Sequence, residues 1–242
     1  MWRLTPSAAE PLGAAEPADL LREDRALVST TTVHLVRHGE VHNPDRILYG
    51  RMPGYRLSDR GVQMAGRVAD HLADSDIALV RSSPLLRAQQ TAAPIAAAHG
   101  LEVTSDPRII ESGNHFEGHR MGHGEAKLSD PRNWRWFRNP LRPSWGEPYR
   151  EQVARVIAAV HDARAAAEGH EAVLVLHQLP IWVTRRSAEG KPLFHDPRRR
   201  QCGLCSVTSL RFVGPHLADV GYAEPAAELY AGAVDATGGR LT

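Results

Sequence analysis

The feature of this sequence that most restricts its fold is an alternation between short strand-like runs and longer segments with helical periodicity. Strands are predicted at about residues 32–37, 77–81, 102–104, 172–176 and 206–212. The run at 172–176 is entirely apolar, which is typical of a central strand buried on both faces. This alternation predicts an α/β fold, a three-layer sandwich in which a mostly parallel sheet carries helices on both faces.

Residues that favour helix ends indicate where the first two helices begin. Ser58 or Asp59 is expected to cap the first helix. The apolar face predicted for this helix consists of Val62, Ala65, Val68, Ala69 and Leu72. Ser83 predicts the cap of the second helix, because Pro84 suits a first helical position. Further helices are expected at residues 149–168 and directly after His177.

The length of 242 residues is enough for one large domain. Residues 1–30 are rich in Ala, Pro and Glu and are expected to form a poorly ordered leader. The main domain is then predicted over 31–215, with a lid insertion at about 106–148 that lacks a steady period. Residues 216–242 are expected to form a C-terminal tail of low pattern.

Charge and apolar content exclude several classes of partner. The formal net charge of +1 argues against nucleic-acid and membrane-surface binding. No apolar run approaches the roughly 18 residues of a membrane span, so a cytoplasmic protein is expected. Cys202 and Cys205 form a single Cys-x-x-Cys pair and are interpreted as reduced structural thiols. A homodimer is left open.

The first predicted strand leads into residues with phosphate chemistry. Arg37 ends this strand, and His38 and Gly39 follow it directly, at the end of a parallel strand where ligands bind in open sheets. Arginine offers a planar fork of donors for phosphate, and neutral histidine can act as a nucleophile near pH 7. His177 ends another predicted strand, and Arg87 falls in the first turns of a helix. Together they predict phosphate binding with covalent transfer.

Four segments, in this order along residues 32–212, resemble the signature blocks of the histidine phosphatase superfamily, also called the phosphoglycerate mutase-like family. They are Leu35-Val36-Arg37-His38-Gly39-Glu40; Gly50-Arg51-Met52-Pro53-Gly54 followed by Leu57-Ser58 and Gly61; Ser82-Ser83-Pro84-Leu85-Leu86-Arg87-Ala88-Gln89-Gln90-Thr91-Ala92; and Val173-Leu174-Val175-Leu176-His177. The resemblance implies a phosphoglycerate mutase-like fold and a phosphate site at these blocks.

The resemblance also implies catalytic roles. His38 is expected to be the nucleophile that becomes phosphohistidine. The residues expected to hold the phosphoryl oxygens are Arg37, Arg87 and His177. Glu111 stands where the family places its general acid, which later activates water. Glu117 is the alternative acid.

The candidate substrate-binding residues are Gly39, Asn43, Arg51 and Gln178. Asn43 lies one residue closer to the nucleophile than in many family members, and Asn43-Pro44 could instead be a turn. Gln178 stands where family members usually carry glycine. This change is expected to affect the type of substrate more than the reaction itself.

The predicted lid contains three histidines at four-residue spacing, His115, His119 and His123. On a helix they would share a face and could bind a metal. The glycines among them disfavour a helix, so a polar lining of the site entrance is the favoured interpretation.

The sequence therefore predicts a phosphomonoester hydrolase that acts through phosphohistidine on a small phosphorylated metabolite, with no metal or other cofactor. Two alternatives remain: a phosphoglycerate-type mutase, and a catalytically silent phosphate-binding module. A mutase must keep its phosphohistidine dry, and the long lid segments expected of such a mutase are missing.

Overall fold

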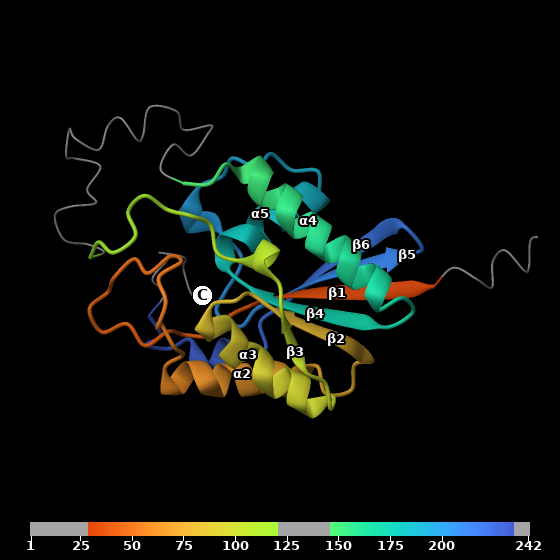
Figure 1. Ribbon diagram of the computed structural model, residues 1–242, viewed down its shortest axis with the longest axis horizontal. Helices are drawn as coiled ribbons and strands as arrows, with labels where there is room; N and C mark the ends of the chain where they lie inside the picture. Colours follow the sequence, from red (N-terminus) through yellow and green to blue (C-terminus); the bar gives the residue numbers. More distant parts are fainter. Residues whose placement is uncertain (1–28, 121–145, 235–242) are drawn as a thin grey trace, which may run out of the picture.

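The computed structural model describes residues 29–120 and 146–234 (Figure 1). In chain order the elements are β1 (Thr30–Arg37), α2 (Asp59–His71), β2 (Ile77–Ser82), α3 (Leu86–Ala98), β3 (Val103–Ser105), η1 (Pro107–Ile109), α4 (Tyr149–Ala166), β4 (Glu171–Leu176), α5 (Gln178–Ala188), η3 (Pro197–Arg199), β5 (Val207–Val213), β6 (His216–Ala223) and η4 (Ala227–Leu229). The five predicted strands and four predicted helices are all present. Most of the predicted leader, and residues 121–145 of the predicted lid, lie outside the described residues.

The strands form one six-stranded sheet in the order β3-β2-β4-β1-β5-β6. The first four of these run parallel, and β5 and β6 pair antiparallel at the other side. The apolar strand β4 lies between β2 and β1, as predicted from its lack of polar residues. The parallel half brings the C-terminal ends of β1, β2 and β4 to one edge of the sheet.

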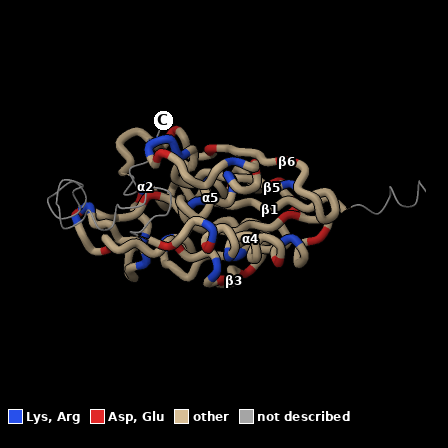
Figure 2. Tube along the Cα trace, turned by 90° about the horizontal axis from the view of Figure 1, so that it is seen from above, with Lys and Arg blue, Asp and Glu red and all other residues tan. Residues whose placement is uncertain are grey.

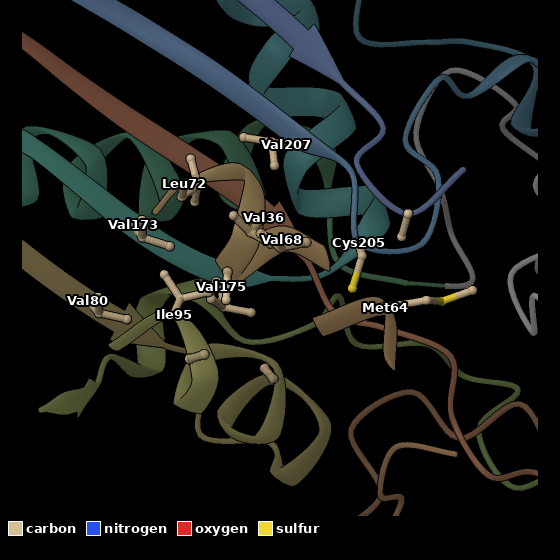
Figure 3. Close-up of a cluster of buried hydrophobic side chains, with 14 of the residues drawn as sticks. Val36, Met64, Val68, Leu72, Val80, Ile95, Val173, Val175, Cys205 and Val207 are labelled. Carbon is tan, nitrogen blue, oxygen red and sulfur yellow. The ribbon is translucent and has the colours of Figure 1, made fainter. Parts of the chain in front are cut away.

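Helices α2 and α3 cover one face of the sheet, and α4 and α5 cover the other (Figure 1). Figure 3 shows the core under α2 and α3, where Val68 lies beside Val36, and Met64 and Val173 belong to the same cluster. On the opposite face, the core is formed by side chains that include Leu35, Leu174, Val156 and Ile181. The three-layer α/β prediction is confirmed.

Three local expectations differ from the structure. Four of the five residues predicted for the apolar face of α2 are buried, but Val62 is 57% exposed and Met64, which was not predicted, is fully buried. Helix α3 begins at Leu86 with Leu85 at the N-cap position, and Ser83 therefore does not cap it. Residues 216–223, expected to belong to a tail, form β6 because they pair with β5.

Lysine and arginine are interspersed with aspartate and glutamate along the described chain (Figure 2). This distribution agrees with the near-neutral formal charge of +1. Among the described helices, none has the length and apolar character needed to cross a membrane.

Candidate active site

The predicted catalytic residues meet at the C-terminal edge of the parallel strands. The register pairs Arg37 of β1 with Leu176 of β4, so both strands end at the same level. Beyond these ends, the His38 amide donates to the carbonyl of Leu176 at 3.1 Å. His38 and His177 therefore follow neighbouring strands, and their ring centroids lie 5.2 Å apart.

His38 is held in one tautomer by its own neighbour. Its Nδ1 lies 2.8 Å from the carbonyl oxygen of Gly39, which can only accept, so Nδ1 carries the proton. The lone pair is then on Nε2, where Nε of Arg87 donates to it at 3.3 Å. The imidazole is almost fully buried. A nucleophilic nitrogen is thus directed at a guanidinium.

Close packing explains why position 39 is a glycine. A Cβ at this position would lie 2.6 Å from the carbonyl oxygen of Gly61, in α2. The Gly39 amide donates to the Thr91 hydroxyl at 3.2 Å. The glycine therefore lets the loop after β1 lie against α2 and α3, which positions the nucleophile.

Two arginines supply the positive charge at the nucleophile. Arg37 is fully buried and donates from Nη1 to the carbonyl of Cys202 at 2.7 Å. Arg87 donates from Nη2 to the carbonyl of Gly50 at 2.7 Å and lies over the Tyr49 ring, 4.6 Å from its centroid. Burial lowers the pKa of Arg87 from its ordinary value, although a guanidinium stays charged at any physiological pH.

His177 is fully buried and held between a hydroxyl and a cation. Its Nδ1 lies 3.4 Å from Nη2 of Arg87, which can only donate, so Nδ1 accepts and Nε2 carries the proton. That Nε2 donates to the Ser83 hydroxyl at 2.8 Å. Burial, followed by the charge of Arg87, lowers the pKa of His177 well below 6.5, so the ring is neutral at pH 7.

Glu111 approaches from the segment after β3. Its Oε1 accepts from the Ser112 amide at 2.8 Å, and its Oε2 lies 3.7 Å from Nδ1 of His177. Burial raises the pKa of this carboxyl, against the opposing charge of Arg87. The protonated form therefore persists to higher pH than in an exposed glutamate, as a general acid requires.

A cavity of about 140 Å³ opens beside Glu111. It is lined by Leu48, Tyr49, Gly50, Glu111, Ser112, Gly113, Asn114, Gly146, Glu147, Gln152, Gln178, Leu179 and Arg200. Arg51 borders this region: it donates from Nε to the Glu111 carbonyl at 2.7 Å and pairs with Glu147 at 2.8 Å. Gln178 is buried in the cavity wall.

Asn43 does not line this cavity, and neither do the residues expected at the phosphate, which are Arg37, His38, Arg87 and His177. Nδ2 of Asn43 donates to the Ile47 carbonyl at 2.8 Å, and its Oδ1 accepts from the Ile47 amide at 3.0 Å. Both ends of the side chain thus close a turn, which is the alternative that the sequence left open.

Glu117, the alternative acid, accepts from the Asn114 amide at 3.2 Å and lies against Gly50. It acts on Arg87 through its charge but does not line the cavity. Of the lid histidines, His123 lies outside the described residues, and Nδ1 of His119 contacts the Phe116 carbonyl at 3.2 Å. The described part of the chain holds no group of three side chains suited to a metal.

Two site residues were missed by sequence reasoning. Ser83 was interpreted as a helix cap and instead holds His177. Arg200 belongs to the basic run Arg198–Arg200, yet it lines the cavity whereas Arg199 is exposed. Its position near the cysteine pair, whose two thiols are buried and form no disulfide, was the available signal.

Comparison with known proteins agrees with this geometry. The model of the histidine phosphatase superfamily (branch 1) matches residues 33–220. The chain is 58% identical over 197 residues to the uncharacterized protein Rv0525 of Mycobacterium tuberculosis (strain ATCC 25618 / H37Rv), covering 81% of this chain and 98% of the relative. It is 30% identical to the probable phosphoglycerate mutase GpmB of Enterobacter sp. (strain 638), covering 74% and 84%.

Among solved structures, YhfR of Bacillus stearothermophilus is similar with 26% identity and a TM-score of 0.65, covering 78% of this chain and 95% of that one. The mycobacterial glucosyl-3-phosphoglycerate phosphatase Rv2419c is similar with 25% identity and a TM-score of 0.63, covering 75% and 90%. The sequence blocks, the sheet and the site geometry agree with these matches. The chain belongs to the histidine phosphatase superfamily.

Proposed function

We propose that this chain is a phosphomonoester hydrolase that acts through a phosphohistidine at His38 on a small phosphorylated metabolite. The observation that carries the proposal is the state of His38, whose Nδ1 proton is bound to the Gly39 carbonyl. The free lone pair of Nε2 lies against Arg87, where a phosphoryl group would be drawn. The solved phosphatase at 25% identity supports hydrolysis as the reaction class.

In the first step, Nε2 of His38 attacks phosphorus and a P–N bond forms while the P–O bond to the alcohol breaks. The electron pair of that bond stays on the leaving oxygen, and Glu111 gives it a proton. Arg37 and Arg87 stabilise the charge that spreads over the phosphoryl oxygens in the transition state. Both guanidiniums are buried, which strengthens this interaction.

In the second step, the Glu111 carboxylate takes a proton from water, and the water oxygen attacks phosphorus. The P–N bond breaks, its electron pair returns to Nε2 of His38, and phosphate leaves. Glu111 must act first as an acid and later as a base, and a carboxyl with a raised pKa suits both roles. Burial raises the pKa of Glu111.

We propose that no metal ion takes part. The positive charge that a divalent ion supplies in other phosphatases comes here from Arg37 and Arg87, beside the neutral His177. Hydrolysis of an aryl phosphate in EDTA tests this directly. Unchanged turnover supports the proposal, and a loss that zinc or manganese restores would overturn it.

The second candidate is a phosphoglycerate mutase, because a relative named as a probable mutase is 30% identical over 84% of its own length. A mutase returns the phosphoryl group to the product, whereas a hydrolase passes it to water. Phosphorus NMR of 3-phosphoglycerate with the protein separates the two: inorganic phosphate indicates the hydrolase, and 2-phosphoglycerate without phosphate indicates the mutase.

Steady-state turnover of an aryl phosphate tests the hydrolase itself. His38→Ala should abolish it while the thermal unfolding temperature stays close to that of the wild type. The matched control is His216→Ala, in an exposed position on β6. A wild-type protein that binds phosphate but turns over no phosphomonoester would instead be a silent binding module.

A further inference from the structure

Arg200 brings a third guanidinium into the cavity beside Glu111. Its Nε donates to Nε2 of His195 at 2.9 Å, and its Nη1 donates to Oε1 of Gln178 at 3.2 Å. The Tyr149 side chain is a further hydrogen-bond partner of Arg200, and all three partners are neutral. Within residues 29–120 and 146–234, Arg200 forms no ion pair with a carboxylate.

The orientation of this guanidinium is determined by His195. Nδ1 of His195 lies 2.7 Å from the Leu193 carbonyl, so it carries the proton and Nε2 is the acceptor for Arg200. Burial, with the charges of Arg200 and Arg186, lowers the pKa of His195 to about 4. His195 is therefore a neutral acceptor at pH 7, and it holds the fork in place before any ligand arrives.

Gln178 connects this guanidinium to the phosphate site. Its Nε2 donates to the Cys202 carbonyl at 3.4 Å, and the same carbonyl accepts from Nη1 of Arg37 at 2.7 Å. Gln178 also follows His177 directly in the chain. A chain of three hydrogen bonds thus connects Arg200 to Arg37, an arginine expected to hold the phosphoryl group.

The other cation at the cavity rim already has a carboxylate partner. Arg51 pairs with Glu147 at 2.8 Å, and Arg155 binds the same carboxylate at 2.7 Å. The direct partners of Arg200 are neutral groups, so burial lowers its pKa, and the carboxyl that opposes this through its charge is Glu111 in the same cavity. The arrangement around Arg200 is the one expected of a site completed by an anion.

We propose that Arg200 binds a carboxylate of the substrate, so that this chain acts on small phosphorylated carboxylic acids. The proposal rests on the proposed phosphatase function and names the class of its substrate. One guanidinium with five donors matches a single carboxylate, whereas the phosphoryl dianion has two guanidiniums of its own. A cavity of about 140 Å³ offers room for about ten water-sized positions, which suits a small acid.

The test compares 3-phosphoglycerate with glycerol 3-phosphate, which has a similar carbon chain and lacks the carboxylate. In the wild type, kcat/KM should favour 3-phosphoglycerate. Arg200→Gln should lower kcat/KM for 3-phosphoglycerate by about ten- to a hundredfold and leave glycerol 3-phosphate within about twofold. Arg199→Gln, one residue away and exposed, is the matched control and should change neither.

A wild type that hydrolyses both compounds equally would overturn the proposal, and so would equal losses on both in Arg200→Gln. Calorimetric binding of both compounds to His38→Ala gives the same comparison without turnover. If aryl phosphate is not hydrolysed at all, the proposed phosphatase function is wrong. The calorimetric binding measurement then still tests whether Arg200 binds the carboxylate. Tighter binding of 3-phosphoglycerate that Arg200→Gln removes supports the proposal, and equal binding overturns it.

Discussion

Replacing Glu111 by glutamine removes one proton donor and little else. The Oε1 atom that accepts from the Ser112 amide at 2.8 Å is kept, and the volume is nearly unchanged. The group that faces His177 becomes an amide, which cannot protonate a leaving alcohol. The effect on turnover should therefore depend on how much help the leaving group needs.

General acid catalysis typically contributes about a hundredfold to ten-thousandfold. Because burial raises the pKa of Glu111, the full effect should appear near neutral pH with alkyl phosphates, whose alcohols leave poorly. An aryl phosphate with an acidic phenol needs little help, so its transfer to His38 should be far less affected. Hydrolysis of the phosphohistidine should slow with both substrates, because the mutant has no carboxylate to activate water.

Stopped-flow measurement of phenol release is the assay. The mutant should give a burst of phenol followed by a slow steady state. The matched control is Glu117→Gln, since Glu117 also acts on Arg87 but does not line the cavity. Equal losses on alkyl and activated aryl phosphates would refute the role of Glu111, and a selective loss in the Glu117 variant would transfer the role to that residue.

Glu111→Gln should also change how the thermal stability of the protein depends on pH. A carboxyl whose pKa is raised in the fold contributes full stability below its ordinary value of 4.5 and loses it as pH rises through the folded value. Glu111→Gln should thus unfold at a higher temperature than the wild type near pH 8, and the difference should shrink toward pH 4. A difference that does not vary with pH would show that burial of the charge is not the cause.

Two further predictions concern residues that position the site. A Cβ at Gly61 would overlap the backbone of Glu40, so Gly61→Ala should lower the free energy of unfolding by about 1–3 kcal/mol. Gly66 lies in open space on the same helix, so Gly66→Ala should raise that free energy by about 1 kcal/mol. Urea titrations of the two variants measure these changes, and equal effects would contradict the packing argument. Ser83→Ala removes the acceptor of His177 and should lower kcat/KM about tenfold without unfolding the protein; unchanged kinetics would show that this hydrogen bond does not position the ring.

The sequence predicts the parallel half of the fold well because its signals are strong and local. The run at residues 172–176 has no polar residue, and it is the central strand β4. Ser58 accepts from the Gly61 amide as a cap, as its position before an amphipathic segment indicates. By contrast, β6 is an edge strand with no buried residue, so it lacks the apolar alternation that would distinguish it from a tail.

The candidate site was predictable where sequence blocks carry it, and not where tertiary contacts decide. Arg37, His38 and His177 follow strands whose shared edge can be inferred from topology alone. The roles of Ser83 and Arg200 depend on side chains more than twenty residues away, Ser83 on His177 and Arg200 on Gln178. The side chain of Asn43 is held by Ile47 in a local turn, and its role toward phosphate stays a prediction.

Trapping the covalent intermediate decides whether His38 is the nucleophile. The protein is mixed with a phosphomonoester labelled in its phosphoryl group and quenched in alkali, which preserves phosphohistidine, and the labelled peptide is then identified. We predict one acid-labile phosphoryl group per chain on His38, absent from His38→Ala and retained in His216→Ala. Label on another residue, or turnover by His38→Ala, would contradict the mechanism.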